Sequence, residues 1–309
     1  MTTTARTAAL LLCLLVVGAC RNAPTAPETV APQASTARPA GAQGAGVAAA
    51  NPYAVEAGLA ILRAGGSAVD AAVAVQAALG LLEPQSSGLG GGAFLLHYDA
   101  QTKRITAYDG RETAPAGATA DMFLDAQGQP LPFADAVTSG RSTGVPGAIA
   151  MLGAAHRQHG RLPWRDLFGG VARVADEGFA VPQRLARFAN SNFPQATLPD
   201  ARALFGTPEG GTVQAGDTLR NPAYAATLRT LASQGPRALL ESPTAEAIVA
   251  RTRAEPLPGT LAATDLAAYR PRVGEPLCRA YRIYVVCVPP PPSSGVALLQ
   301  MLAILEHTD

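Results

Sequence analysis

The sequence predicts an α/β sandwich, in which helical layers enclose strands. Patterns typical of strands occur near both ends of the folded part, at 93–108 and 278–287, and helical patterns dominate between them. The composition, 48% hydrophobic and 15% charged over 309 residues, is that of a globular protein with a full-sized core. No internal repeat divides the chain.

The first 20 residues have the features of a secretory signal peptide. Arg6 supplies a short positive region, residues 8–17 are apolar, and small residues precede Cys20. The apolar stretch is too short to span a membrane. Its ending resembles a bacterial lipoprotein signal, which would make Cys20 a lipidated N-terminus. The protein would then lie in the cell envelope, periplasmic or on the outer surface. Cleavage at a neighbouring small residue is the alternative.

Residues 21–46 are predicted to be a disordered tether. They are rich in Ala, Pro, Gly, Ser and Thr and have no apolar periodicity, so they cannot bury enough surface to fold. We therefore expect the folded domain to occupy residues 47–309.

Two helices are expected at the start of this domain, over 54–63 and 68–82. The first ends at a glycine pair. The second follows Ser67, and Asp70 stands three residues later, as in a capping box. It is apolar nearly all round, which predicts burial on most sides. The apolar face of the first helix is expected to contain Val55, Leu59 and Leu62.

A β-hairpin is expected next, with strands at 93–98 and 104–108. A glycine-rich turn, residues 88–92, leads into it. Glycine is needed where the backbone closely approaches a neighbouring group, since a side chain would clash there. This turn is therefore expected to bring the backbone against another element.

The hairpin ends in a charged segment that contains Asp109, Arg111 and Glu112. An arginine just past a strand end offers a rigid fork of donors that can grip a carboxylate. We expect Arg111 to belong to a site that binds a small acid. The two carboxylates could act as acid/base groups or orient Arg111, and a surface salt bridge is the alternative.

Helical patterns then continue to the second strand pair. Pro146 is expected in the first turn of a helix that ends at Gly160, and one amphipathic helix is expected over 164–177, ended by glycine. Further helices are expected over 222–233, 243–253 and 295–306. The last helix is apolar, with neither a cap nor a final strand after it, so the chain is expected to be truncated.

The cysteines fall into two groups. Cys13 lies in the predicted signal peptide and Cys20 is the candidate lipidation site. Cys278 and Cys287 flank a predicted hairpin. In an oxidising compartment this pattern predicts a disulfide, and two small core residues are the alternative.

Other chemistry-bearing motifs are incomplete. The glycine run lacks the Lys-Ser/Thr of a phosphate loop and precedes a strand, so no nucleotide or other cofactor is predicted. His156 and His159 have no third ligand, so no metal site is predicted. Ser294 is explained as a helix N-cap, and no G-x-S-x-G elbow occurs. A net charge of +1 without a basic run argues against nucleic acid.

Seven segments carry a family resemblance. They lie between Ala50 and Glu306 and read NPYAVEAGLAILRAGGSAVDAAVAV, EPQSSGLGGGAF, YDGRETAP, TGVPGAIAML, HGRLPWRDLF, ADEGFAV and PPPPSSGVALLQMLAILE. In this order and spacing they resemble the large-subunit portion of the γ-glutamyltranspeptidase family, within the N-terminal-nucleophile hydrolases. Asn51 and Ser67 depart from the residues common in the family, His and Asn, at positions without expected chemistry.

The resemblance implies an αββα N-terminal-nucleophile hydrolase sandwich, incomplete because the chain stops before the small subunit. It implies a precursor that cleaves itself, exposing a threonine that is the nucleophile and, through its amine, its own base. That threonine would follow Asp309, so no catalytic residue is expected in this chain. Arg111 matches the arginine of the family's RE-x-A-P motif, which binds the α-carboxylate of the γ-glutamyl group. Glu112 is expected to support it.

The implied reaction is γ-glutamyl transfer and hydrolysis on glutathione and other γ-glutamyl amides. The acceptor would be water, an amino acid or a peptide, and the protein partner would be the chain's own small subunit. The lipid anchor would be the sole membrane contact. This chain alone is expected to be inactive. The alternatives are a β-lactam or glutaryl acylase of the same fold, and a non-catalytic envelope lipoprotein that binds small carboxylates.

Overall fold

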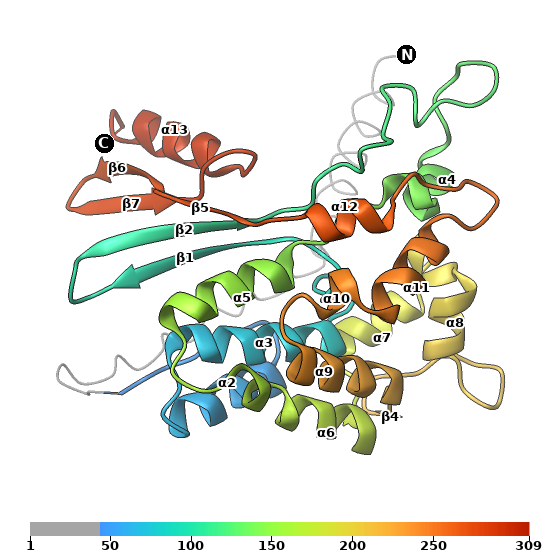
Figure 1. Ribbon diagram of the computed structural model, residues 1–309, viewed down its shortest axis with the longest axis horizontal. Helices are drawn as coiled ribbons and strands as arrows, with labels where there is room; N and C mark the ends of the chain where they lie inside the picture. Colours follow the sequence, from blue (N-terminus) through green and yellow to red (C-terminus); the bar gives the residue numbers. More distant parts are fainter. Residues whose placement is uncertain (1–43, 309) are drawn as a thin grey trace, which may run out of the picture. The chain divides into compact units, whose positions relative to one another are not determined.

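The computed structural model describes residues 44–308, and from Ala45 onward they belong to one compact unit (Figure 1). The signal peptide predicted at 1–20, with Cys20, and most of the predicted tether lie outside the described residues. The first helix or strand begins at Pro52. Among the helices of residues 44–308, none has the length and hydropathy that a membrane crossing requires.

The first two helices confirm the prediction closely. Helix α2 spans Pro52–Arg63 and helix α3 spans Ala68–Leu82. The capping box is formed: the Ser67 N–H donates to Oδ2 of Asp70 at 2.8 Å, and the Asp70 N–H donates to Oγ of Ser67 at 3.1 Å. Ten of the 15 residues of α3 are buried, as its apolar pattern predicted.

The buried face of α2 differs from the prediction. Its buried residues are Ala54 and Gly58. A Cβ atom on Gly58 would lie 2.8 Å from Cγ2 of Val75, so α2 and α3 pack closely along a line of small residues. The larger apolar residues of the predicted face flank that line and are half-buried: Val55, Leu59 and Leu62.

A three-stranded antiparallel sheet carries the candidate site. Strands β1 (Ala93–Asp99) and β2 (Arg104–Gly110) form the predicted hairpin, in a register that pairs Ala93 with Gly110. A short strand β5 (Arg272–Gly274) extends the sheet in the order β1-β2-β5. Helix α5 (Ala148–His159) lies between this sheet and the α2–α3 pair (Figure 1).

The start of α5 was wrongly predicted. The helix begins at Ala148, and Pro146 precedes it rather than forming its first turn. The N–H groups of Gly147 and Ala148 both donate to the carbonyl of Gly91, at 3.1 and 3.0 Å. This tertiary contact defines where the helix starts. Gly160 caps its C-terminus, as predicted.

The single helix predicted over 164–177 is two elements. A 3-10 turn η3 (Trp164–Leu167) precedes helix α6 (Gly169–Glu177), and Gly178 ends the helix as predicted. Between them Phe168 is buried, with its ring 5.1 Å from that of Trp164. The indole N–H of Trp164 donates to the carbonyl of Leu231 at 2.9 Å. Anchoring these two rings breaks the helical path just before a glycine pair, which favours helix poorly.

Two later helices also confirm the sequence prediction, α9 (Pro222–Gln234) and α11 (Pro243–Thr252), whose N-caps are Asn221 and Ser242. The short elements were not predicted, because they are too brief for a periodic pattern. They are α4 (Phe133–Thr138), η2 (Gly140–Ser142), β3 (Phe179–Ala180), α7 (Gln183–Ala189), η4 (Pro194–Thr197), α8 (Pro199–Phe205), β4 (Thr218–Leu219), α10 (Ala238–Glu241) and α12 (Ala263–Ala268).

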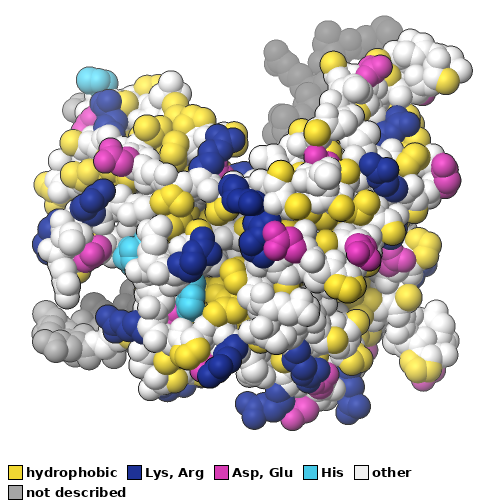
Figure 2. Space-filling model, in the orientation of Figure 1, with side chains coloured by type: hydrophobic (Ala, Val, Ile, Leu, Met, Phe, Trp, Pro, Cys, Tyr) yellow, Lys and Arg dark blue, Asp and Glu magenta, His cyan; other side chains and the backbone are white. Residues whose placement is uncertain are grey.

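The last described part is a hairpin with a helix. Strands β6 (Leu277–Tyr281) and β7 (Tyr284–Val288) pair Cys278 with Cys287, and these two cysteines are joined as a disulfide. Helix α13 (Gly295–Leu305) packs on this hairpin. Large apolar side chains are exposed over both elements (Figure 2): Leu277, Ile283, Tyr284, Val285, Val296, Leu298, Met301, Ile304 and Leu305. We call them the C-terminal apolar surface.

The architecture is a mixed α+β fold. The longer strands lie near both ends of the described residues, and the part between them is mostly helical apart from the short pair β3 and β4. The main core joins α3, α5, α6 and α9. A smaller core holds α10, α11 and α12 together and includes Tyr269. This smaller core places α12 beside the segment that follows β2, where Arg111 lies (Figure 1).

Candidate substrate-binding site

Arg111 is the first residue after β2, and its backbone is held on both sides. Its N–H donates to Oδ1 of Asp109 at 2.9 Å. Its carbonyl accepts a hydrogen bond from the hydroxyl of Tyr269, at 2.8 Å. Tyr269 is buried beyond the end of α12, so the backbone of Arg111 is positioned by one neighbour in the sequence and by one residue 158 positions away.

Tyr269 is suited to this donor role. Burial raises the pKa of its phenol to about 12, and the carboxylates of Asp109 and Glu112 act in the same direction. The hydroxyl therefore keeps its proton at neutral pH and can donate it to a carbonyl. The fixed backbone leaves the side chain of Arg111 as the part that can respond to a ligand.

Arg111 lines a cavity of about 610 Å³. Nη1 lies 3.1 Å from Oε2 of Glu112, and 49% of the Arg111 side chain is exposed. An exposed ion pair of this kind adds little to folding stability. It holds the guanidinium at the cavity wall, where its remaining donors can meet an anion. The polar lining also includes Thr113, Arg141, Ser142 and Thr143.

The glycine run explains how Glu112 reaches this position. A Cβ atom on Gly92 would lie 2.6 Å from Cδ of Glu112, inside contact distance. Only glycine leaves room for the carboxylate there. The carbonyl of Gly91 receives the two N–H groups that open α5. The expected close approach of the backbone to another element is thus observed, and it involves the candidate site itself.

Three histidines, His97, His156 and His159, lie outside the cavity that Arg111 lines and form two separate groups of contacts. His97 and His159 stack with ring centroids 3.7 Å apart. Nε2 of His159 lies 2.8 Å from the hydroxyl of Tyr108, which donates to Oε1 of Gln158 at 2.7 Å. Burial lowers the pKa of His159, and the neighbouring His97 lowers it further. These contacts join β1 and β2 to α5.

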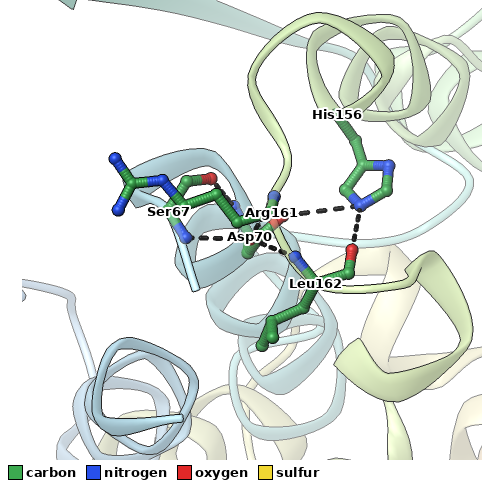
Figure 3. Close-up of polar contacts among 5 residues, drawn as sticks. All are labelled: Ser67, Asp70, His156, Arg161 and Leu162. Atoms are coloured by element: carbon green, nitrogen blue, oxygen red, sulfur yellow. Dashed lines mark hydrogen bonds and ion pairs between the residues drawn. The ribbon is translucent and has the colours of Figure 1, made fainter. Parts of the chain in front are cut away.

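His156 turns toward a different partner, Asp70 (Figure 3). Its Nε2 lies 2.9 Å from the carbonyl of Leu162 and 3.4 Å from Oδ1 of Asp70. Both are acceptors, so Nε2 carries a proton. Oδ2 of Asp70 accepts from the N–H groups of Ser67, Arg161 and Leu162. This cluster ties the start of α3 to the loop after α5.

The side chains of His156 and His159 therefore contact different partners and do not form one site. Within residues 44–308, no group of three or more His, Cys, Asp or Glu side chains is arranged to hold a metal ion. His97, placed in a strand by the sequence, lies in β1 and packs against α5.

Two residues of the site escaped the sequence analysis, Arg141 and Tyr269. Arg141 lines the same cavity as Arg111 but belongs to η2, which lies 30 residues further along the chain. Tyr269 lies in the loop between α12 and β5. Neither stands in a local pattern that marks a site, so no signal within a few residues could have revealed them.

The sequence of this chain was compared with those of known protein families and proteins. The family model described as Gamma-glutamyltranspeptidase matches residues 54–309. The glutathione hydrolase proenzyme of Bacillus subtilis (strain 168) is 38% identical over 262 residues, which cover 84% of this chain and 44% of that protein. This chain thus spans less than half the length of that curated relative.

Solved structures of related proteins are similar to this chain as well. Gamma-glutamyltranspeptidase from Helicobacter pylori aligns with a TM-score of 0.80 at 30% identity, covering 86% of this chain and 76% of that chain. Cephalosporin acylase from Bacillus halodurans aligns with a TM-score of 0.70 at 28% identity, covering 89% of this chain and 52% of that chain. These likenesses confirm the predicted fold class.

Proposed function

The chain belongs to the γ-glutamyltranspeptidase family, and on that premise we propose that it is the large-subunit portion of an enzyme that transfers and hydrolyses γ-glutamyl groups. The donors are glutathione and other γ-glutamyl amides. The acceptor is water, an amino acid or a peptide. The name of the Bacillus subtilis relative, glutathione hydrolase proenzyme, supports this substrate class.

One observation carries the proposal: Arg111 lines a cavity, with its backbone fixed and its side chain half exposed. The rigid fork binds the α-carboxylate of the γ-glutamyl group through two charge-assisted hydrogen bonds. Glu112 keeps the guanidinium at the cavity wall until the substrate arrives. Fixing one end of the substrate restricts where the γ-carbonyl can lie, which favours attack by a positioned nucleophile.

The nucleophile is a threonine in a small subunit that lies downstream of Asp309 in a self-cleaving precursor. Its hydroxyl attacks the γ-carbonyl while its own amine accepts the proton. That proton passes to the departing amine as the amide C–N bond breaks, and the acceptor then attacks the acyl-enzyme ester and restores the threonine hydroxyl. Two observations support a missing partner. The chain spans 44% of the Bacillus subtilis relative, and the C-terminal apolar surface is exposed over β6, β7 and α13. Exposed apolar patches of this kind mark contact surfaces.

The enzyme is held in the cell envelope by a lipid on Cys20, with residues 21–46 as the tether. The support comes from the sequence of the first 46 residues alone. A Cys20→Ser change in the full-length protein releases it from the membrane fraction. If the variant stayed in the membrane fraction, another part of the protein would have to anchor it.

The experiment on the active site replaces Arg111 in the full-length precursor. Arg111→Gln lowers kcat/KM for a γ-glutamyl donor by about 100-fold, because a charge-assisted bidentate contact is lost. Self-cleavage stays intact, since the side chain of Arg111 makes no described contact that the fold depends on besides Glu112. Arg104→Gln, at the exposed start of β2, the strand that Arg111 follows, is the matched control. Loss of self-cleavage in the Arg111 variant would mean that this arginine has a structural role.

A second function is favoured by one comparison, the likeness to the cephalosporin acylase of Bacillus halodurans. Activity of the mature enzyme on glutaryl amides, with none on γ-glutamyl amides, would support it. The glutaryl group keeps the terminal carboxylate and lacks only the α-amino group, so Arg111 by itself does not separate the two substrates. We rank this function second because the Bacillus subtilis relative is named a glutathione hydrolase proenzyme. A non-catalytic lipoprotein is the third: it would bind glutamate without any maturation.

A further inference from the structure

A second arginine, Arg141, shares the cavity with Arg111. It belongs to the 3-10 turn η2, which follows α4, and its side chain is half-buried. Its Nη1 donates to the carbonyl of Met122 at 3.0 Å and to that of Leu124 at 3.4 Å. Main-chain carbonyls therefore hold the guanidinium in place. A guanidinium fixed in this way loses little entropy when it binds a ligand.

The remaining donors of Arg141 have no carboxylate partner. Among the described residues, no Asp or Glu side chain lies within ion-pair distance of Arg141, whereas Glu112 pairs with Arg111 at 3.1 Å. The charged residues that line the cavity are two arginines and one glutamate. Asp121 lies close enough for Arg141 to lower its pKa, but it is neither within ion-pair distance of Arg141 nor part of the cavity lining. Within the cavity lining, Arg141 is therefore the arginine without a paired carboxylate.

We propose that Arg141 binds a second carboxylate of the substrate, the C-terminal carboxylate of a γ-glutamyl peptide such as glutathione. Arg111 holds the α-carboxylate at one end of such a ligand and Arg141 holds the other end. The cavity volume of about 610 Å³ is in the range that encloses a small peptide. Ser142 and Thr143 line the same cavity beside Arg141. The site therefore selects γ-glutamyl peptides with a free C-terminus over γ-glutamyl amides that carry a neutral group. This inference rests on the proposed function.

The experiment compares two donors that differ only at the far end, glutathione and glutathione with its C-terminal carboxylate converted to an amide. KM and kcat are measured for each donor with the full-length, self-cleaved enzyme. Arg141→Gln raises KM for glutathione about tenfold, because one charge-assisted contact is lost. KM for the amide stays within about twofold. Arg141→Lys keeps the charge but loses the fork, so it restores part of the affinity for glutathione.

Two controls separate this role from others. Arg165→Gln removes the same charge from an exposed position paired with Asp166, away from the cavity, and leaves KM for both donors unchanged. Arg111→Gln raises KM for both donors, because both carry the α-carboxylate.

Equal increases of KM for the two donors in the Arg141 variant would overturn the inference, because they would show that Arg141 only supports the loop at 122–124. Unchanged values for both would overturn it as well. Either result leaves the proposed function standing, since the unmodified enzyme still turns over both donors. A mature enzyme that uses neither donor would instead refute the proposed function, and the inference with it.

Discussion

At the scale of single residues, Asp70 shows how a buried charge is stabilised. Its side chain has no exposed surface, and burial by itself would raise its pKa. Hydrogen bonds from the N–H groups of Ser67, Arg161 and Leu162 outweigh burial, and His156 adds to them, so the pKa is lowered from its ordinary value of 3.8. The sequence predicted the bond to Ser67. The other partners lie about 90 residues further along the chain and join only in the folded structure.

This cluster predicts a particular dependence of stability on pH. A folded-state pKa below the unfolded value means that the Asp70 carboxylate stabilises the fold fully above about pH 5, and that this stabilisation is lost as the pH falls below 3.8. In Asp70→Asn one acceptor oxygen becomes a donor, so backbone N–H groups lose their partner. We expect a loss of about 1–3 kcal/mol in the free energy of unfolding at pH 7.

The measurement is urea unfolding of the full-length protein between pH 2.5 and pH 7. The difference between the original protein and Asp70→Asn shrinks toward acid pH. Asp166→Asn, an exposed carboxylate paired only with Arg165 among the described side chains, is the control. A difference that is constant over this range would show that the charge of Asp70 contributes nothing.

At the scale of elements, the glycine run and the start of α5 form one unit with the end of β2. Gly91 accepts the first N–H groups of the helix, and Gly92 leaves space for the carboxylate of Glu112. The glycine run therefore connects helix packing to the candidate site. This link explains why α5 starts two residues after Pro146.

Two neighbouring glycines offer a matched test of this unit. A side chain at Gly92 overlaps the Glu112 carboxylate, whereas a Cβ atom at Gly90 meets nothing within 4 Å. Gly92→Ala should displace Glu112, raise KM for a γ-glutamyl donor about fivefold to tenfold and destabilise the fold by about 1–3 kcal/mol. Gly90→Ala should leave KM within about twofold. Similar effects of both changes on KM and on the melting temperature would argue that Glu112 is not held by Gly92.

At the scale of the molecule, the C-terminal apolar surface is the feature that the described residues leave uncovered. Met301 on α13 is 55% exposed, and Ile283 at the hairpin turn is 88% exposed. Burying one such side chain contributes about 1.5–3 kcal/mol. A surface with several of them is a contact surface, and we propose that the small subunit covers it.

Charge introduced into this surface tests the proposal. Met301→Asp should lower the melting temperature of the full-length protein by several degrees, because a charge would be forced into an apolar contact. Phe133→Asp, at a position on α4 that is 79% exposed and outside this surface, should have little effect. If both variants melt at the temperature of the original protein, the surface is not covered.

The sequence by itself determined the features that depend on residues close together in the chain. The capping box at Ser67, the hairpin strands between 93 and 108 and the Cys278–Cys287 pair follow from interactions within a few positions. The segments that resemble the family indicated Arg111 as the substrate-binding candidate. The tertiary structure alone decided what surrounds Arg111. The hydroxyl of Tyr269 reaches its backbone across 158 positions, and Arg141 joins its cavity from another element. Such contacts arise from how helices and strands pack, and no periodicity or local motif encodes which side chains then face one another.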